Sequence, residues 1–264
     1  MIRAFRAELV KLRRRRVLLI TAIVTIVASV GGAALVVTSA EPARSRGGDG
    51  RAVTIADLAD AGGGTDVFTS VISFAGTFVF VVFVGAIAAE FSRGTVRTML
   101  LRQPARLRLL TGKTAATLTF AAAVLAAVEI LTWTAARLLA PGQDIPTGDW
   151  ASLDGVGHAL ADYAAALFWV TGYALLGTLV GVLVRSVPVA LAIGIAWAGP
   201  FEHLLQEAWE PASRVFPGLL LEAYAAGGTP DVTAGRAFAT LAAYLLLAAA
   251  VTGLVFSRRD VTTA

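Results

Sequence analysis

The sequence contains no cysteine and only two histidines among its 264 residues. The lack of cysteine excludes a disulfide framework, a thiol nucleophile and a cysteine-ligated metal. Two histidines are too few for a histidine-rich metal centre. Charged residues are also scarce, at 15% of the chain, whereas a soluble domain carries about 25%. We therefore expect neither a soluble enzyme nor a nucleic-acid-binding domain, and no metal or cofactor.

Hydrophobic residues are abundant, at 57% of the chain, and a soluble globule of this size cannot bury that much apolar surface. About 20 residues in a helix, at about 1.5 Å each, cross the hydrocarbon of a bilayer. The runs are continuous and rich in Ala and Leu, which favours helices over barrel strands. The sequence predicts a single all-α polytopic membrane domain over 1–264, with six spans at about 17–40, 67–89, 114–136, 163–184, 187–201 and 237–256. The fifth of these is short.

The positions of Lys and Arg predict the orientation, because cytoplasmic segments carry an excess of both. Sixteen of the 22 basic residues lie in 1–16, in 90–113, at Arg185 and in 258–259. The opposite loops hold 14 of the 18 acidic residues. This bias predicts six crossings and both termini in the cytoplasm. The first apolar run is longer than the stretch of about 7–15 residues in a signal peptide, so it is expected to stay as an uncleaved span. The net charge of +4 is then explained by the inner membrane surface and requires no nucleic acid.

Residues 1–16 have the pattern of an amphipathic helix. Ile2, Phe5, Leu9 and Leu12 recur at helical spacing, with cations around them. Such a helix lies in the membrane interface. It serves either as a topology anchor or as a lever beside a cytoplasmic partner.

Segment 90–113 mixes six cations with many apolar residues and is longer than a minimal turn. Gly94 is expected to end the second span, and Thr95 to cap a new helix. Pro104 then ends that helix. We predict a short amphipathic cytoplasmic helix from Thr95 to about Arg102, which either couples to a partner or only sets the topology. Gly112-Lys113-Thr114 resembles the end of a P-loop, but position 107 is Leu107 where that loop needs Gly, so nucleotide binding by this chain is not expected.

Two further features lie within or beside the spans. Glu129 is an ionisable residue well inside the third span. It either lines a substrate path or binds a cation, or it is a neutral carboxyl that is hydrogen-bonded to a neighbouring helix. Segment 202–236 carries an apolar stretch, 215–221, that is too short to cross, which predicts a broken outer segment that re-enters or lies on the surface. Gly177 and Gly181 allow close helix packing.

Taken together, the order of these features resembles the membrane-spanning permease of type-2 ABC transporters, particularly the half-size actinobacterial kind. The resemblance covers nearly the whole chain. Two local motifs carry it: Arg6-Ala7-Glu8-Leu9-Val10-Lys11-Leu12-Arg13, and Glu90-Phe91-Ser92-Arg93-Gly94-Thr95-Val96-Arg97 followed by Leu100-Leu101, Pro104, Arg106 and Lys113.

This resemblance implies a division of labour between chains. A separate ABC ATPase subunit would hydrolyse ATP, and two permease chains, identical or different, would form the path of an exporter. Residues 1–16 would be a connecting helix, and 202–225 an outer re-entrant region. The short helix between the second and third spans would be a coupling helix, and Glu90, Gly94, Thr95, Arg97 and Leu100 would lie at or near the site where the ATPase docks.

Two other functions stay open from the sequence. One is a proton-coupled secondary transporter that uses Glu129, although internal repeats and further intramembrane charges are not evident. The other is a non-transporting membrane scaffold, immunity or sensor subunit. An intramembrane enzyme is not expected, because no Gly-x-Ser-x-Gly elbow, zinc motif or aspartyl pair appears. The transported substrate cannot be read from the residues.

Overall fold

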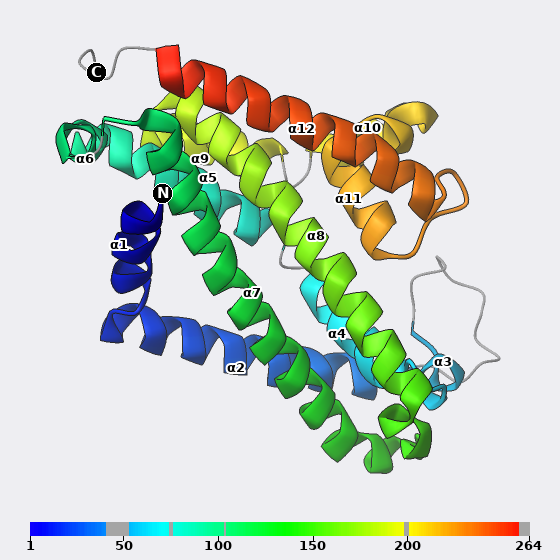
Figure 1. Ribbon diagram of the computed structural model, residues 1–264. Helices are drawn as coiled ribbons and strands as arrows, with labels where there is room; N and C mark the ends of the chain where they lie inside the picture. Colours follow the sequence, from blue (N-terminus) through cyan, green and yellow to red (C-terminus); the bar gives the residue numbers. More distant parts are fainter. Residues whose placement is uncertain (41–52, 74–75, 103, 198–200, 259–264) are drawn as a thin grey trace. The chain divides into compact units, whose positions relative to one another are not determined.

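The computed structural model describes residues 1–40, 53–73, 76–102, 104–197 and 201–258 (Figure 1). Within these residues the chain is built of helices. One isolated β-bridge with both partners in this part of the chain joins Gly228 to Thr233. Among the described residues, four helices are long and apolar enough to cross a membrane, or five if the bent pair Phe78–Ser92 and Thr95–Leu101 counts as one span. The four are α2 (Arg15–Thr38), α7 (Arg106–Leu139), α8 (Leu153–Val184) and α12 (Ala234–Arg258). The chain is an all-α membrane protein.

The chain, treated as one domain from its sequence, forms two compact units that each combine distant segments. Unit 1 comprises Met1–Leu12, Ala75–Phe120 and Phe168–Ala264, and unit 2 comprises Arg13–Phe74 and Ala121–Leu167. Helices α7 and α8 each contribute one part to each unit.

Unit 2 contains α2, α3 (Ile55–Ala59), α4 (Gly63–Ser73) and the short 3-10 turns η2 (Ala140–Gln143) and η3 (Gly148–Ala151). Trp150 is central to its core: it is buried against Leu58 and Val67, and its Nε1 donates to the Leu58 carbonyl at 2.9 Å. The turn into α3 is fixed by a capping box, in which Thr54 and Asp57 exchange hydrogen bonds. Large apolar side chains of α2 nevertheless stay exposed, such as Ile20 at 64% and Val27 at 66%, as expected for a helix that faces lipid.

Unit 1 contains α1 (Ile2–Leu12), α5 (Gly76–Ser92), α6 (Thr95–Arg102), α9 (Val187–Ala196) and α12, with parts of α7 and α8. Gly177 and Gly181 let α8 approach α5 closely, because a Cβ at either position would meet Phe83 or Ile87 at about 3 Å or less. The small-residue pair of the sequence is therefore an internal packing contact.

The predicted spans differ from the helices at several boundaries. The run 67–89 is divided between α4 and α5, on either side of residues 74–75, which lie outside the described residues. Helix α9 ends at Ala196, after 10 residues, and 198–200 are likewise outside the described part. Helices α7 and α8 begin earlier than the runs at 114 and 163, because backbone hydrogen bonds continue a helix through charged residues that an apolar-run criterion omits.

The segment after α9 is broken, as predicted. It forms α10 (Glu202–Ala208), the 3-10 turn η5 (Glu210–Arg214) and α11 (Pro217–Ala225). Helix α11 lies beside α12 (Figure 1) and is largely buried, with Leu220 and Leu221 fully enclosed. A Cβ on Gly172 of α8 would clash with Leu221, so α11 also packs tightly against α8.

Candidate functional site

The predicted cytoplasmic helix is α6, and it lies across the end of α5 at an angle of 72° (Figure 1). Gly94 makes the bend, with a φ of 66° in the left-handed region that favours glycine. Its N–H donates to the Phe91 carbonyl at 3.0 Å. The hydroxyl of Thr95 donates to the Glu90 carbonyl at 3.0 Å. Thr95 therefore satisfies a carbonyl at the end of α5, whereas the sequence suggested that it caps the start of α6.

The inner face of α6 is anchored on an apolar cluster of unit 1. Val96 is buried there against Phe91 and Phe256, whose rings meet edge to face with centroids 6.1 Å apart. Met99 and Leu100 pack against the same cluster. Leu100, which the resemblance placed at a docking site, thus faces inward in this structure.

The outer face of α6 is exposed and carries Arg97, Thr98 and Leu101. Leu101 is 82% exposed, and it shares a face with Arg97 because the two are four residues apart on a helix. An apolar side chain next to a cation on a protruding helix is suited to contact with another protein. The sequence did not distinguish Leu101 from its neighbour, because both are leucines in one amphipathic segment.

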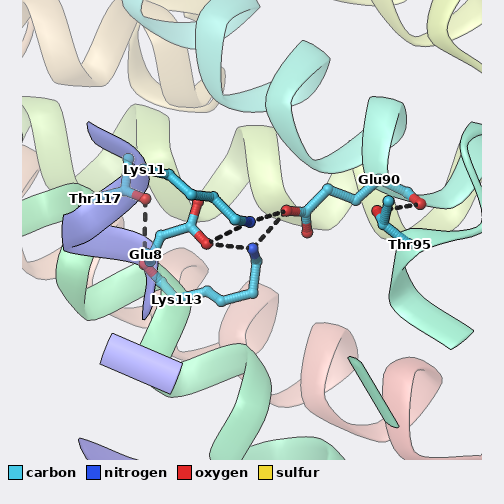
Figure 2. A network of polar contacts seen from close by, with 6 residues as sticks. All are labelled: Glu8, Lys11, Glu90, Thr95, Lys113 and Thr117. Carbon is cyan, nitrogen blue, oxygen red and sulfur yellow. Dashed lines mark hydrogen bonds and ion pairs between the residues drawn. The ribbon is translucent and has the colours of Figure 1, made fainter. Parts of the chain in front are cut away.

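Below the bend, four charged side chains from three helices form a closed network (Figure 2). The ammonium of Lys113 on α7 contacts Glu8 of α1 at 2.6 Å and Glu90 of α5 at 2.5 Å. The ammonium of Lys11 on α1 contacts the same two carboxylate groups, at 3.0 and 3.3 Å. Two positive and two negative charges therefore alternate, and the network is neutral.

The network is largely withdrawn from solvent, since the side chain of Lys113 is 7% exposed and that of Glu8 is 15% exposed. Burial alone would raise the pKa of the Glu8 carboxyl, but hydrogen bonds and charge from Lys113 and Lys11 outweigh burial and hold this pKa below its ordinary value. Burial alone would lower the pKa of Lys11, and Glu8 with Glu90 raises it instead. Both ions are thus held in their charged forms.

Helix α1 reaches the network because it packs closely on the start of α7. Ala4 of α1 is buried, and a Cβ on Gly112 would fall within 3 Å of Ala4 and of the Met1 carbonyl. Gly112 precedes Lys113, so the contact of the two helices brings Lys113 toward Glu8. The sequence alone did not identify Glu8 and Lys113 as partners. The sequence carried one signal for these partners, because acidic residues are scarce on the basic side of the predicted membrane. Those outside the spans there are Glu8, Glu90 and Asp260.

Further contacts within unit 1 connect the end of α5 to Arg185, which follows α8, and the start of α7 to the end of α12. The hydroxyl of Ser92 donates to the Arg185 carbonyl at 3.0 Å, and the Arg185 guanidinium lies 4.8 Å from the Phe91 ring centroid. Arg106 of α7 donates to the Phe256 and Ser257 carbonyls at the end of α12. A cation at a helix C-terminus is favourable. The base of α6 is therefore held by α5, α7, α8 and α12.

A comparison with protein-family profiles finds a match over residues 55–262. The chain belongs to the DUF2705 family, described as a protein of unknown function. No curated protein and no solved structure matches it. The matched region includes α6, Glu90 and Lys113, and it begins after α1, which contributes Glu8 and Lys11.

Glu129 lies in unit 2, on α7, apart from the unit that holds α6. Its Oε1 is buried and has no hydrogen-bond partner among the described residues. Thr132, one turn further along α7, is fully buried with its hydroxyl in the same situation. Both hypotheses for Glu129 therefore stay predictions.

Among the described residues, no group of three His, Cys, Asp or Glu side chains is placed to hold a metal. His203 instead pairs with Glu222, with His203 Nε2 3.1 Å from a carboxylate oxygen of Glu222. Its neighbour Glu202, the first residue of α10, is buried, and its carboxylate accepts a hydrogen bond from the Leu219 N–H in the first turn of α11 at 2.8 Å. These contacts join α10 to α11.

Proposed function

We propose that this chain is the membrane-spanning permease subunit of an ATP-driven type-2 ABC exporter. In this proposal the six apolar runs cross a bacterial plasma membrane, and both termini are cytoplasmic. A separate ABC ATPase subunit hydrolyses ATP, and two permease chains, identical or different, form the substrate path. The chain itself has no nucleotide site.

The observation that carries the proposal is the construction of α6. A helix that only set topology would need a few cations. Helix α6 has in addition a fixed bend at Gly94, a buried inner face and an exposed Leu101 beside Arg97. These features suit a coupling helix that fits a groove on a moving ATPase and passes the motion into α5 and α7.

The charge network supports the same role. Glu90 does not offer its carboxylate to a partner, because Lys113 and Lys11 engage it. Its part in coupling is then to tie α5 to α1 and α7, so that a push on α6 moves three helices together. Helix α1 serves as the connecting helix.

On the opposite side, α10, η5 and α11 form the outer re-entrant region of the proposal. The tight packing of α11 on α8 and α12 gives this region a rigid attachment. Movement of those helices would therefore reach the outer end of the path.

The test is the partner that stays with the chain. The tagged protein is purified from host membranes in mild detergent, and the co-purifying subunits are identified by mass spectrometry and by ATP hydrolysis. We expect a stoichiometric subunit with a P-loop. Arg97→Glu and Leu101→Glu should each reduce its recovery by at least about tenfold, because a charge reversal or a buried charge at an interface costs several kcal/mol.

Arg236→Glu is the matched control. Arg236 is an exposed arginine in the first turn of α12, whereas the last turn of α12 is the one that packs near α6. It should retain the ATPase, and all three variants should insert in the membrane as the wild type does. If no P-loop subunit accompanies the wild-type chain, a proton-coupled transporter or a membrane scaffold replaces this proposal.

A further inference from the structure

An open groove of about 680 Å³ lies in unit 1 between α7, α8 and α12. Its size is within the range of about 300–1,000 Å³ that is usual for ligand sites. Leu107, Leu110 and Leu118 form one wall, Leu175 lies on α8, and Ala250 with Leu254 forms the other wall. The helices that border it are all long and apolar enough to cross a membrane. Its lining extends from the predicted spans to Leu107 and Ser257 at their cytoplasmic ends, so the groove would reach from the hydrocarbon to the headgroup region.

Five hydroxyl groups also line the groove, and four of them donate their protons within their own helices. Thr111 donates to the Leu107 carbonyl, Thr178 to Ala174 and Thr252 to Ala248, at 2.6–2.8 Å. Ser257 donates to the Leu254 carbonyl at 2.9 Å. The wall therefore presents few free donors to a ligand, and a hydrocarbon chain suits it better than a polar molecule.

One end of the groove is basic. Arg106 bridges the start of α7 to the last carbonyls of α12 at this end. Arg108 lies between the lining residues Leu107 and Leu110, and Arg258 directly follows the lining residue Ser257, so both arginines lie beside this end of the groove. Both side chains are exposed. Among the described residues that line the groove, none is acidic.

We propose that this groove binds an anionic phospholipid, with one acyl chain along α7, α8 and α12 and the headgroup at Arg108 and Arg258. The apolar wall recognises the chain, and the basic end selects the negative headgroup. This lipid site does not depend on an ATPase partner, so a test of lipid binding can fail or succeed independently of the proposed transport function.

The experiment measures lipid binding to the detergent-purified full chain by native mass spectrometry. Phosphatidylglycerol and phosphatidylcholine with identical acyl chains are the probes. We expect the wild type to bind phosphatidylglycerol more tightly. Arg108→Gln with Arg258→Gln should weaken its binding by about fivefold for each arginine removed, and leave the binding of phosphatidylcholine unchanged.

Ala250→Phe tests the groove itself, because Ala250 is an exposed lining residue and a phenyl ring would fill the space. It should reduce the binding of both lipids. Two control variants should behave as the wild type: Ala192→Phe, at an exposed alanine of α9 that does not line the groove, and Arg236→Gln at the other end of α12. Size-exclusion profiles and thermal unfolding identify any variant that fails to fold.

Three outcomes would overturn the proposal. Equal affinity of the wild type for the two lipids would contradict the headgroup site at the arginines. Unchanged lipid binding by Ala250→Phe would contradict binding in the groove. The third concerns a second copy of the chain in the groove. Because the chain has no cysteine, Ala250→Cys supplies a single thiol, and efficient disulfide cross-linking of two chains in native membranes would show that a protein occupies this face.

Discussion

At the scale of single residues, the charge network depends on Lys113 more than on any other described member. Lys113 is the most buried of the four and touches both carboxylate groups. Lys11 also touches both, but it is 44% exposed and its contacts are longer. A buried charge that loses its partner is costly, while an exposed pair contributes little.

Lys113→Met should therefore lower the free energy of unfolding by about 3 kcal/mol, because it leaves Glu8 and Glu90 facing each other with only Lys11 between them. Thermal or denaturant unfolding in detergent measures this loss. Glu8→Gln should cost less in the Lys113→Met background than in the wild type, since the two share one interaction. Arg3→Met, at an exposed cation of α1, should change stability by less than about 0.5 kcal/mol. Additive losses from Glu8 and Lys113 would contradict the network.

Glu202 makes stability depend on pH in the opposite sense to Glu8. Burial, and then the charge of Glu222, raises the pKa of Glu202 from 4.5 to about 7, although the Leu219 and Gly218 N–H groups act against the shift. A carboxyl with a raised pKa binds its proton more tightly in the folded state, so its stabilising effect is complete below pH 4.5 and is lost as pH rises to about 7. The lowered pKa of Glu8 gives a stabilising effect that is complete above pH 4.5 and is lost as pH falls below that value.

Unfolding of the purified protein between pH 4.5 and 7 should show this slope, which is at most about 1.4 kcal/mol for each pH unit. Glu202→Gln should remove most of it, because an amide does not titrate. His203→Gln serves as the comparison, since His203 Nε2 lies 3.1 Å from a carboxylate oxygen of Glu222. A slope that survives Glu202→Gln would contradict the assignment to Glu202.

At the scale of elements, α6 is a case in which local sequence signals agreed with the structure. The predicted helix from Thr95 to about Arg102 is confirmed, as is the break at Gly94. The break is local because glycine alone accepts the left-handed conformation without a steric cost. Local sequence did not predict the role of Thr95 or the inward direction of Leu100, because both depend on how α5 and the apolar cluster approach α6.

Gly94→Ala should destabilise the bend by about 1 kcal/mol, because the new Cβ has space around it but the φ of 66° is unfavourable for alanine. Gly94→Asn should cost less, since asparagine tolerates this conformation. Limited proteolysis at the bend and thermal unfolding measure the effect. Gly148→Ala is the matched control, because Gly148 also has open space and its φ is not positive. Equal effects at the two glycines would argue against backbone strain.

At the scale of the whole molecule, the distribution of charge predicts which segments face the cytoplasm. This prediction can be tested directly because the natural chain has no cysteine to remove. Leu101 of α6 and Leu153 at the start of α8 are 82% and 92% exposed, so a thiol at either position would be accessible to a reagent on its own side of the membrane.

A membrane-impermeant maleimide added to intact cells should label Leu153→Cys strongly. Leu101→Cys should be labelled only after the membrane is opened, because the positive-inside rule places α6 in the cytoplasm. Labelling of both variants after permeabilisation is the control for reactivity. Labelling of Leu101→Cys in intact cells would reverse the topology and exclude contact of α6 with a cytoplasmic ATPase.

By itself, the sequence determined that the chain is an all-α membrane protein, and it determined the short helix after Gly94. Both follow from properties of consecutive residues: long apolar runs, helical spacing and the backbone freedom of one glycine. The tertiary structure alone decided that Glu8 and Glu90 share Lys113, that Leu101 faces outward while Leu100 packs inward, and that three helices enclose an apolar groove. Those features join residues far apart in the chain, and spacing along a sequence carries no measure of such distances.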